Sequence, residues 1–251
     1  MFQLNNFLNN PNMKPIEQMG PFRVFEHEKD LSVNPSSAVN AYFASEMHVR
    51  KRQVLMELQK GGCVTQAGAM QWMLGNVQME TGVKGVGNFL GKMVSSAVTK
   101  ESAVKPIYRG NGIVMLEPTY KHIILLDVSQ WGCVVLDDGL FLACEETLQQ
   151  KVVARSNFSS GVLGGEGLFN LSLIGKGIAA LESPVPKEEL IEFNLDNDVV
   201  KIDGNMAIAW SGSLQFTVEK SGKSLIGSAA SGEGFVNVYR GTGKILMAPT
   251  A

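Results

Sequence analysis

A unit of about 65 residues occurs in three copies in this chain, and no other feature constrains the fold as strongly. Lys105–Thr119 contains Tyr-Arg-Gly-x-Gly followed by Pro-Thr, and Tyr239–Thr250 repeats the pattern. Gly165–Ser183 shares with Gly232–Thr250 a Gly-Glu-Gly start and a Gly-x-Gly pair. The Gly-x-Gly pairs begin at Gly110, Gly175 and Gly241, 65 and 66 residues apart. Because a unit of about 65 residues buries a poor core alone, we expect the three copies to stack and share one.

Composition favours a turn-rich β protein. The chain has 27 Gly in 251 residues, with 8% aromatic and 18% charged residues, which suits short strands and turns better than helices. Apolar and polar residues alternate over Lys187–Leu195, as in a half-buried strand. The predicted fold class is therefore all-β, a sandwich or barrel built from triplicated repeats.

The repeats are expected to form one β domain over residues 49–251, preceded by an N-terminal region. Repeat boundaries are predicted at about 49–119, 120–183 and 184–251. Within residues 1–48 we expect a loose polar arm, a short strand pair and a short helix, over Met1–Gly20, Phe22–Val33 and Ala38–Met47. Asn34 is the predicted helix N-cap, with Pro35 in the first turn. A second small helix is predicted within Gly82–Lys100.

The repeated motifs resemble a known family. Gly68–Met73, Leu163–Phe169, Asp203–Trp210 and Gly232–Ala248 look like the altered inheritance of mitochondria 24 family, whose hallmark is a Gly-Glu-Gly-(Leu/Phe)-Phe corner followed by a Gly-x-Gly hairpin in internal copies. The resemblance covers roughly Val49–Ala251. It implies a β-rich fold similar to tandem subunits of the tryptophan RNA-binding attenuation protein, and a scaffold or binding role. It supplies no catalytic residues.

Two sets of glycines are predicted to occupy turns that need a positive φ. The first set separates strands early in each repeat and comprises Gly68, Gly139 and Gly204. The second set forms the Gly-x-Gly hairpins and comprises Gly110, Gly112, Gly175, Gly177, Gly241 and Gly243. A phosphate-binding alternative is disfavoured, because Gly85–Gly91 has one residue too many for Gly-x-Gly-x-x-Gly and Gly222-Lys-Ser lacks the first Walker glycine.

Equivalent carboxylates mark the corners of the three repeats: Glu101, Glu166 and Glu233. They could form a ring around a pseudo-three-fold axis and attract a cation or a basic partner. The favoured interpretation is that each carboxylate accepts backbone N–H bonds at its own corner. Repeat one departs from the pattern, with Glu101-Ser-Ala in place of Gly-Glu-Gly.

Other reactive side chains show no catalytic or metal-binding spacing. The three histidines, His27, His48 and His122, are dispersed, and the odd set Cys63, Cys133 and Cys144 fits buried thiols in a reducing cytoplasm. The repeat-two acids, Asp137-Asp138 and Glu145-Glu146, are predicted to lie at solvated edges because neighbours on a strand point to opposite faces. We predict no catalytic residue, no metal and no cofactor.

Two recurring polar features have competing interpretations. The Tyr-Arg pairs at Tyr108 and Tyr239 could stack on a partner, although cross-strand packing is favoured. The basic run Arg50-Lys51-Arg52 is predicted to be the solvated start of a strand. A net charge of −2 argues against nucleic acid as a partner.

The sequence thus predicts a non-catalytic, cytoplasmic β scaffold that works through assembly or protein binding, as a homo-oligomer. Two alternatives stay open: a small-molecule or RNA-binding module, and an enzyme of unfamiliar type that uses the repeat-two acids. No stretch reaches about 18 apolar residues, so no membrane span is predicted. Peripheral membrane association through Val86–Val98 is a minor alternative.

Overall fold

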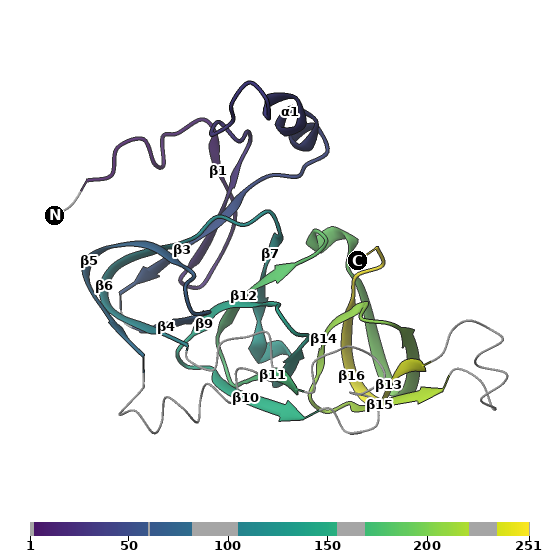
Figure 1. Ribbon diagram of the computed structural model, residues 1–251. Coiled ribbons are helices and arrows are strands. Elements are labelled where there is room, and N and C mark those ends of the chain that lie inside the picture. The colour runs from purple at the N-terminus through teal and green to yellow at the C-terminus, as the bar shows by residue number, and fades with distance from the viewer. Residues whose placement is uncertain (1–2, 60, 82–104, 155–168, 221–234, 251) are drawn as a thin grey trace.

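β strands dominate the computed structural model, which describes residues 3–59, 61–81, 105–154, 169–220 and 235–250 (Figure 1). The predicted all-β class is confirmed. The small helix predicted within Gly82–Lys100 lies outside the described residues, as do Glu101, Glu166 and Glu233.

The N-terminal region contains more regular structure than the sequence predicted. β1 (Met13–Met19) and β2 (Phe22–His27) form an antiparallel hairpin, and β2 pairs with β3 (Arg52–Leu58) of repeat one. The prediction of a loose arm up to Gly20 is therefore wrong for β1, because the strand takes its order from β2 rather than from a pattern of its own. Phe22, at the start of β2, is fully buried.

The one α-helix among the described residues, α1 (Ala38–Glu46), agrees with the predicted helix to within one residue. Asn34 accepts hydrogen bonds at Oδ1 from the backbone N–H groups of Ser36 and Ser37, at 3.0 and 3.1 Å. These bonds stabilise a turn that leads into the helix, and the N-cap position itself is Ser37. The predicted N-cap, Asn34, therefore lies three residues before the observed one.

Each repeat contributes a similar series of strands. Repeat one contains β3, β4 (Cys63–Thr65), β5 (Met70–Glu80) and β6 (Ile107–Leu116). Repeat two contains β7 (His122–Asp127), the 3-10 turn η1 (Val128–Gln130), β8 (Cys133–Leu136), β9 (Phe141–Glu145), β10 (Gln149–Ala154), β11 (Phe169–Ile174) and β12 (Ile178–Ser183). Repeat three contains the 3-10 turn η2 (Lys187–Glu189), β13 (Ile191–Asp203), β14 (Ala207–Ser211), β15 (Gln215–Lys220) and β16 (Phe235–Met247).

These strands form two antiparallel sheets that run side by side, with repeat one at the left of Figure 1 and repeat three at the right. The first sheet has the order β1-β2-β3-β6-β4-β9-β12-β7, with β5 added on β6. The second has the order β10-β11-β8-β14-β16-β13, with β15 added on β16. Neighbouring repeats are therefore joined by strand pairing, at β4–β9 and at β8–β14.

The repeats share their hydrophobic cores, as a unit of this size requires. One cluster joins Val64 of repeat one to Leu173 of repeat two and Leu246 of repeat three. A second cluster joins Phe22 of the N-terminal hairpin to Leu125 of repeat two. Removing one repeat would expose apolar surface on its neighbours.

The glycines of the second predicted set do not all lie in hairpins. Gly175 and Gly177 flank the turn between β11 and β12, but Gly110 and Gly112 lie inside β6, and Gly241 and Gly243 lie inside β16. The hairpin prediction is therefore wrong for two of the three pairs. Its conformational basis holds for the first glycine of each pair, because Gly110, Gly175 and Gly241 have φ values of 125°, 123° and 119°.

The reason is that β5 and β6 bend together at these glycines instead of ending. Gly110 and Gly112 lie opposite Val77 and Gly75. A Cβ at Gly110 would lie 2.0 Å from the carbonyl oxygen of Asn76, so only glycine permits this approach of the two backbones. The first set is found in turns, since Gly68, Gly139 and Gly204 each lie between two strands with positive φ.

Candidate functional site

Two of the four repeat-two acids, Glu145 and Glu146, are held by hydrogen bonds within the fold. Glu145 Oε2 accepts the backbone N–H of Ile178 at 2.6 Å. Glu146 forms an ion pair with Arg109 of repeat one, whose Nε donates to both carboxylate oxygens at 3.0 and 2.9 Å. This guanidinium lowers the pKa of Glu146. The pair stabilises the junction between repeats.

The recurring tyrosine of repeat three packs within its own sheet. Tyr239 is buried, its ring lies 5.2 Å from the Phe216 ring, and the two residues are cross-strand partners. Arg240 donates to Thr217 and Glu219 on the same neighbouring strand. The favoured cross-strand interpretation of the Tyr-Arg pairs is confirmed here.

Histidines and cysteines also have ordinary surroundings. His27 Nε2 lies 2.7 Å from Gln53 Oε1, and burial lowers the pKa of His122. Cys63 and Cys144 are buried. Within the described residues, no group of three or more His, Cys, Asp or Glu side chains is placed to hold a metal ion. The ring of corner glutamates stays a prediction.

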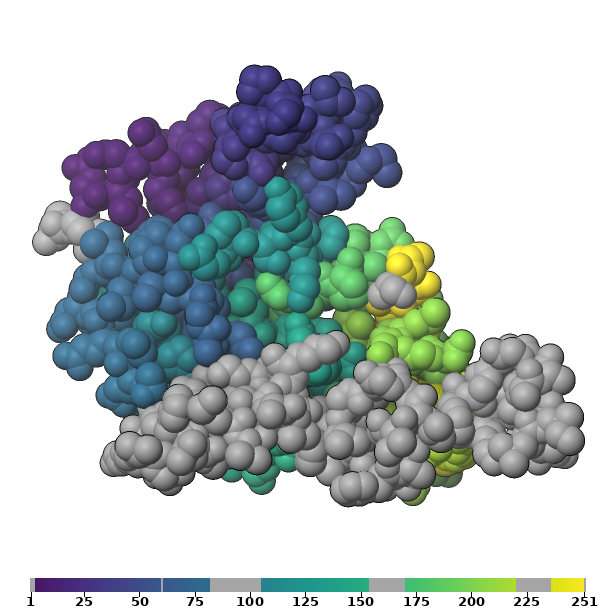
Figure 2. All heavy atoms as spheres, in the orientation of Figure 1, coloured from purple at the N-terminus to yellow at the C-terminus, as the bar shows by residue number. Residues whose placement is uncertain are grey.

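An exposed apolar surface surrounds α1, and the sequence had not indicated it. None of the residues of this helix is buried. Tyr42 and Phe43 are each 61% exposed, their rings lie 5.5 Å apart, and Val39 and Met47 are also exposed. We call these four residues together with Leu31 the α1 surface. In the space-filling view the N-terminal region forms a layer above the repeats (Figure 2).

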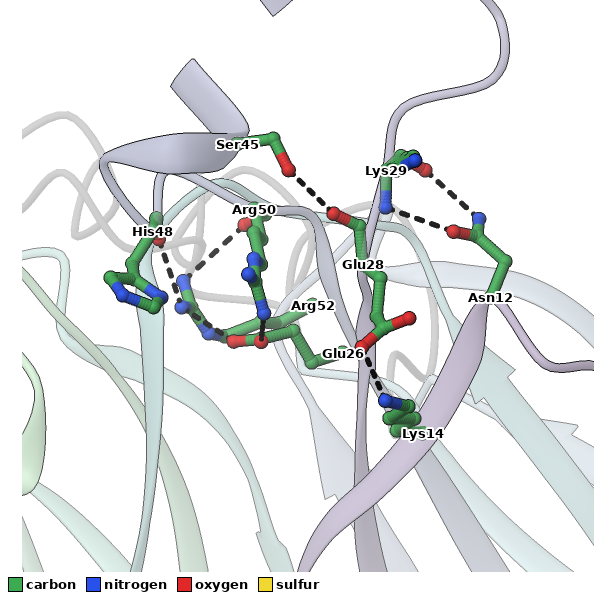
Figure 3. Close-up of polar contacts among 9 residues, drawn as sticks. All are labelled: Asn12, Lys14, Glu26, Glu28, Lys29, Ser45, His48, Arg50 and Arg52. Atoms are coloured by element: carbon green, nitrogen blue, oxygen red, sulfur yellow. Dashed lines mark hydrogen bonds and ion pairs between the residues drawn. The ribbon is translucent and has the colours of Figure 1, made fainter. Parts of the chain in front are cut away.

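The α1 surface is exposed because polar contacts, rather than apolar packing, hold the helix to the segment that follows β2 (Figure 3). Ser45 Oγ donates to the backbone carbonyl of Glu28 at 2.7 Å. Asn12 exchanges two hydrogen bonds with the backbone of Lys29, each at 2.9 Å. The chain leaves the helix at His48, which has a left-handed φ of 59°. These bonds do not involve the large apolar side chains of α1, which are exposed.

Two arginines below the helix share one carboxylate. Glu26 receives Arg50 Nη1 at 2.9 Å and Arg52 Nη2 at 2.7 Å (Figure 3). Arg52 also donates to the backbone carbonyl of His48, at 3.3 Å, and its side chain is only 5% exposed. The prediction that the basic run is a solvated strand start is therefore wrong for Arg52. Its partner lies 26 residues earlier, on β2.

A second polar anchor joins the segment before α1 to repeat two. Asp30 lies 2.8 Å from Lys51 Nζ and accepts the Tyr120 hydroxyl at 2.7 Å. The Lys51 ammonium, with the hydroxyls of Ser32 and Tyr120, holds the pKa of Asp30 well below its usual range. The pKa values of Lys51 and Tyr120 are raised in turn by Asp30. This network fixes the position of the α1 surface.

A small cavity opens beside the α1 surface, between the helix and the segment that precedes it. Its volume is about 160 Å³. Leu31, Val33, Ala38 and Tyr42 supply most of its apolar lining, and Lys29, Asp30 and Glu46 lie at its polar side. Small-molecule sites usually have volumes of about 300–1,000 Å³. The cavity is therefore suited to one inserted side chain rather than to a cofactor.

Comparison with known protein families identifies the family to which the repeats belong. A family model described as mitochondrial biogenesis AIM24 matches residues 45–250. The chain belongs to the AIM24 family. The matched range begins at the end of α1, so the N-terminal hairpin and most of the α1 surface precede the part shared with the AIM24 model.

Two proteins that are similar to this AIM24-family chain come from the bacterium Streptococcus pyogenes. An uncharacterized protein of serotype M6 is 31% identical over 203 residues, which cover 77% of this chain and 79% of that protein. The crystal structure of a protein from the same species, a structural genomics target, has a TM-score of 0.57 at 28% identity. The structural match covers 79% of this chain and 87% of the chain in the crystal structure. Among the described residues, no helix has the length and apolar character needed to cross a membrane.

Proposed function

We propose that this AIM24-family chain is a non-catalytic cytoplasmic scaffold that acts by binding another protein, with the α1 surface as the contact. The single observation that carries the proposal is a helix with no buried residue whose large apolar side chains face solvent. Clustered exposed apolar residues mark interaction surfaces, and aromatic residues dominate the binding energy of such surfaces. The free thiols of the three cysteines fit a reducing compartment.

The polar anchors that hold α1 in place favour a role in binding. Both polar anchors hold the helix before any partner arrives, so little conformational entropy remains to be lost on binding. The cavity accepts one large apolar side chain next to the Tyr42 ring. The expected partner is therefore a protein segment with exposed aliphatic or aromatic side chains that insert beside α1.

The charges around the α1 surface favour a protein over a membrane. The helix α1 contains no Lys or Arg and has one acidic residue, Glu46. The nearby ammonium groups of Lys14 and Lys51 are paired with Glu28 and Asp30. Helices that bind anionic membranes carry Lys and Arg on their polar face. The small-molecule or RNA-binding alternative has less support, because the cavity is small and the net charge is −2.

Site-specific photo-crosslinking in the host cell tests the proposal. A photoreactive residue at Phe43 should give discrete protein adducts, whereas the same residue at Val152 on β10, 58% exposed, should not. Tyr42→Ser should weaken the adducts at position 43 without changing the melting temperature, since Tyr42 is exposed. Adducts of lipid or small-molecule mass, or the same adduct pattern at both positions, would contradict the proposal.

A further inference from the structure

The two junctions between repeats use the same pattern of strand pairing. In each junction, the strand before the first-set turn glycine of one repeat pairs antiparallel with the strand after the equivalent glycine of the next repeat. β4 pairs with β9, where Val64 lies opposite Cys144. β8 pairs with β14, where Val135 lies opposite Trp210. The same geometry is therefore built twice from different side chains.

Backbone hydrogen bonds frame both pairings at equivalent positions. The N–H of Glu146 donates to the carbonyl of Gly62 at 2.8 Å, and the N–H of Gly212 donates to the carbonyl of Cys133 at 2.9 Å. The other ends are closed by the bonds Gln66–Leu142 and Asp137–Ile208, at 2.8 and 2.9 Å. Because these bonds involve the main chain alone, the pattern can extend to a third junction.

The strands that would form a third junction lie at opposite ends of the chain. The second half of β13 corresponds to β4 and β8, and the first half of β5 corresponds to β9 and β14. Within the described residues, β13 pairs only with β16 and β5 pairs only with β6, so each has one unpaired side. β5 lies at the left and β13 at the right of Figure 1.

Pairing partners inside each repeat fix the register of this third junction. Val64, Val135 and Lys201 occupy the same position in the three repeats. They lie opposite Ile107 on β6, Ser172 on β11 and Val238 on β16, each of which is three residues before the first glycine of its Gly-x-Gly pair. Cys144, Trp210 and Met73 likewise share a position, since they pair with Ala179, Ile245 and Val114. Lys201 is therefore the counterpart of Val64, and Met73 the counterpart of Cys144.

We infer that a second copy of this chain completes the third junction, with β13 of one copy paired antiparallel to β5 of the next and Lys201 opposite Met73. In this arrangement the N–H of Gly75 in one copy donates to the carbonyl of Val199 in the other, just as the N–H of Glu146 donates to the carbonyl of Gly62 in the internal junction. This contact joins two different surfaces, so it propagates head to tail and gives a closed ring or an open filament. It gives a structural basis for the homo-oligomer expected from the sequence, goes beyond the proposed function and does not involve α1.

Exposure of apolar residues at both edges supports the inference. Met73 is 43% exposed on β5 and Val199 is 46% exposed on β13, whereas Val64 and Cys144 in the internal junction are buried. Exposed strand edges recruit other strands unless they are blocked. Lys201 on the β13 edge disfavours indiscriminate pairing, and the uncharged Met73 opposite it presents no like charge.

Sedimentation velocity of the full chain across a concentration series tests the inference. We expect wild type to form multiples of 27.2 kDa. Met73→Lys places two lysines opposite each other and should raise the concentration needed for assembly at least tenfold. Met79→Lys, on the same strand and 47% exposed, lies beyond the junction and should have no such effect. The double variant Met73→Lys/Lys201→Glu should restore assembly.

Three results would overturn the inference: a wild-type monomer at 100 times the concentration used for purification, equal effects of Met73→Lys and Met79→Lys, or no recovery in the double variant. Circular dichroism of each variant confirms that the fold is retained. Photo-crosslinking from position 43 in Met73→Lys separates this inference from the proposed function, since binding at the α1 surface should survive the loss of edge pairing.

Discussion

Arg52 on β3 lies 2.7 Å from Glu26 on β2, and this pair is the most buried ion pair below the α1 surface. Removing one partner of a buried pair leaves an uncompensated charge, which costs about 3 kcal/mol. We therefore expect Glu26→Gln to lower the free energy of unfolding by about 3 kcal/mol, measured by urea denaturation. The control is Glu28→Gln, whose partner Lys14 is exposed, and little change is expected. Equal effects would show that burial of Arg52 is not decisive.

The network around Asp30 predicts how stability depends on pH. The pKa of Asp30 is lowered in the folded state from an ordinary value of 3.8. Its contribution is therefore fully present above about pH 4 and disappears as the pH falls toward the folded-state pKa. Asp30→Asn should cost about 1 kcal/mol at pH 7 and progressively less below pH 4. A cost that is constant from pH 7 to pH 2 would contradict this assignment.

The bend in β6 requires glycine. Gly110→Ala would place a Cβ against the Asn76 carbonyl oxygen at a φ of 125° and should destabilise the protein by about 3 kcal/mol, measured by thermal or urea unfolding. Gly61→Ala is the control, because no heavy atom lies within 4 Å of the added Cβ. Its effect should stay within about 0.5 kcal/mol. A tolerated Gly110→Ala would mean that β5 and β6 can separate at the bend.

Thiol labelling should distinguish the three cysteines. Burial raises the pKa of Cys144 to about 12 and also raises that of Cys63, and the reactive form is the thiolate. Cys133 is half-buried. At pH 8 an aromatic disulfide reagent should therefore react first with Cys133, and with the other two only at the rate of unfolding. Cys133→Ser should abolish the early phase, and an early phase that persists would place a reactive thiol elsewhere.

The corner glutamates can be tested by metal analysis. If each carboxylate holds its own turn, purified protein should contain no stoichiometric metal, and Glu101→Gln, Glu166→Gln and Glu233→Gln should each lower stability separately. If the three form a ring, a chelator should lower the melting temperature of wild type but not of the triple variant. The two outcomes are mutually exclusive.

The sequence predicted the fold class because the features that specify it are local and recur. Glycines with positive φ return at a fixed spacing, and the strands between them are apolar. The same glycines led to a wrong prediction of hairpins, because a turn and a bend within a strand both require a positive φ, as at Gly110. Only the pairing of β5 with both halves of β6 distinguishes the two.

The candidate site escaped sequence reasoning because its determinants are not local. Arg52 looks like a solvated basic residue until β2 places Glu26 beside it. The exposure of Tyr42 and Phe43 depends on which other segments pack against α1, and that cannot be read from the helix sequence. A helical pattern alone predicts only that α1 forms. The available signal was weak amphipathicity: Val39, Tyr42 and Phe43 share the helix with Asn40, Ser45 and Glu46, and the apolar residues do not form one clear core-facing stripe.

Strand pairing between repeats follows the order in which the chain is synthesised. β4 leaves the ribosome before β9, and β8 before β14, so each new repeat meets a finished edge from the repeat before it. Domains generally fold from the N-terminus during synthesis. Each completed repeat can therefore act as a template for the next, and the edges of β4 and β8 are unpaired only until β9 and β14 emerge.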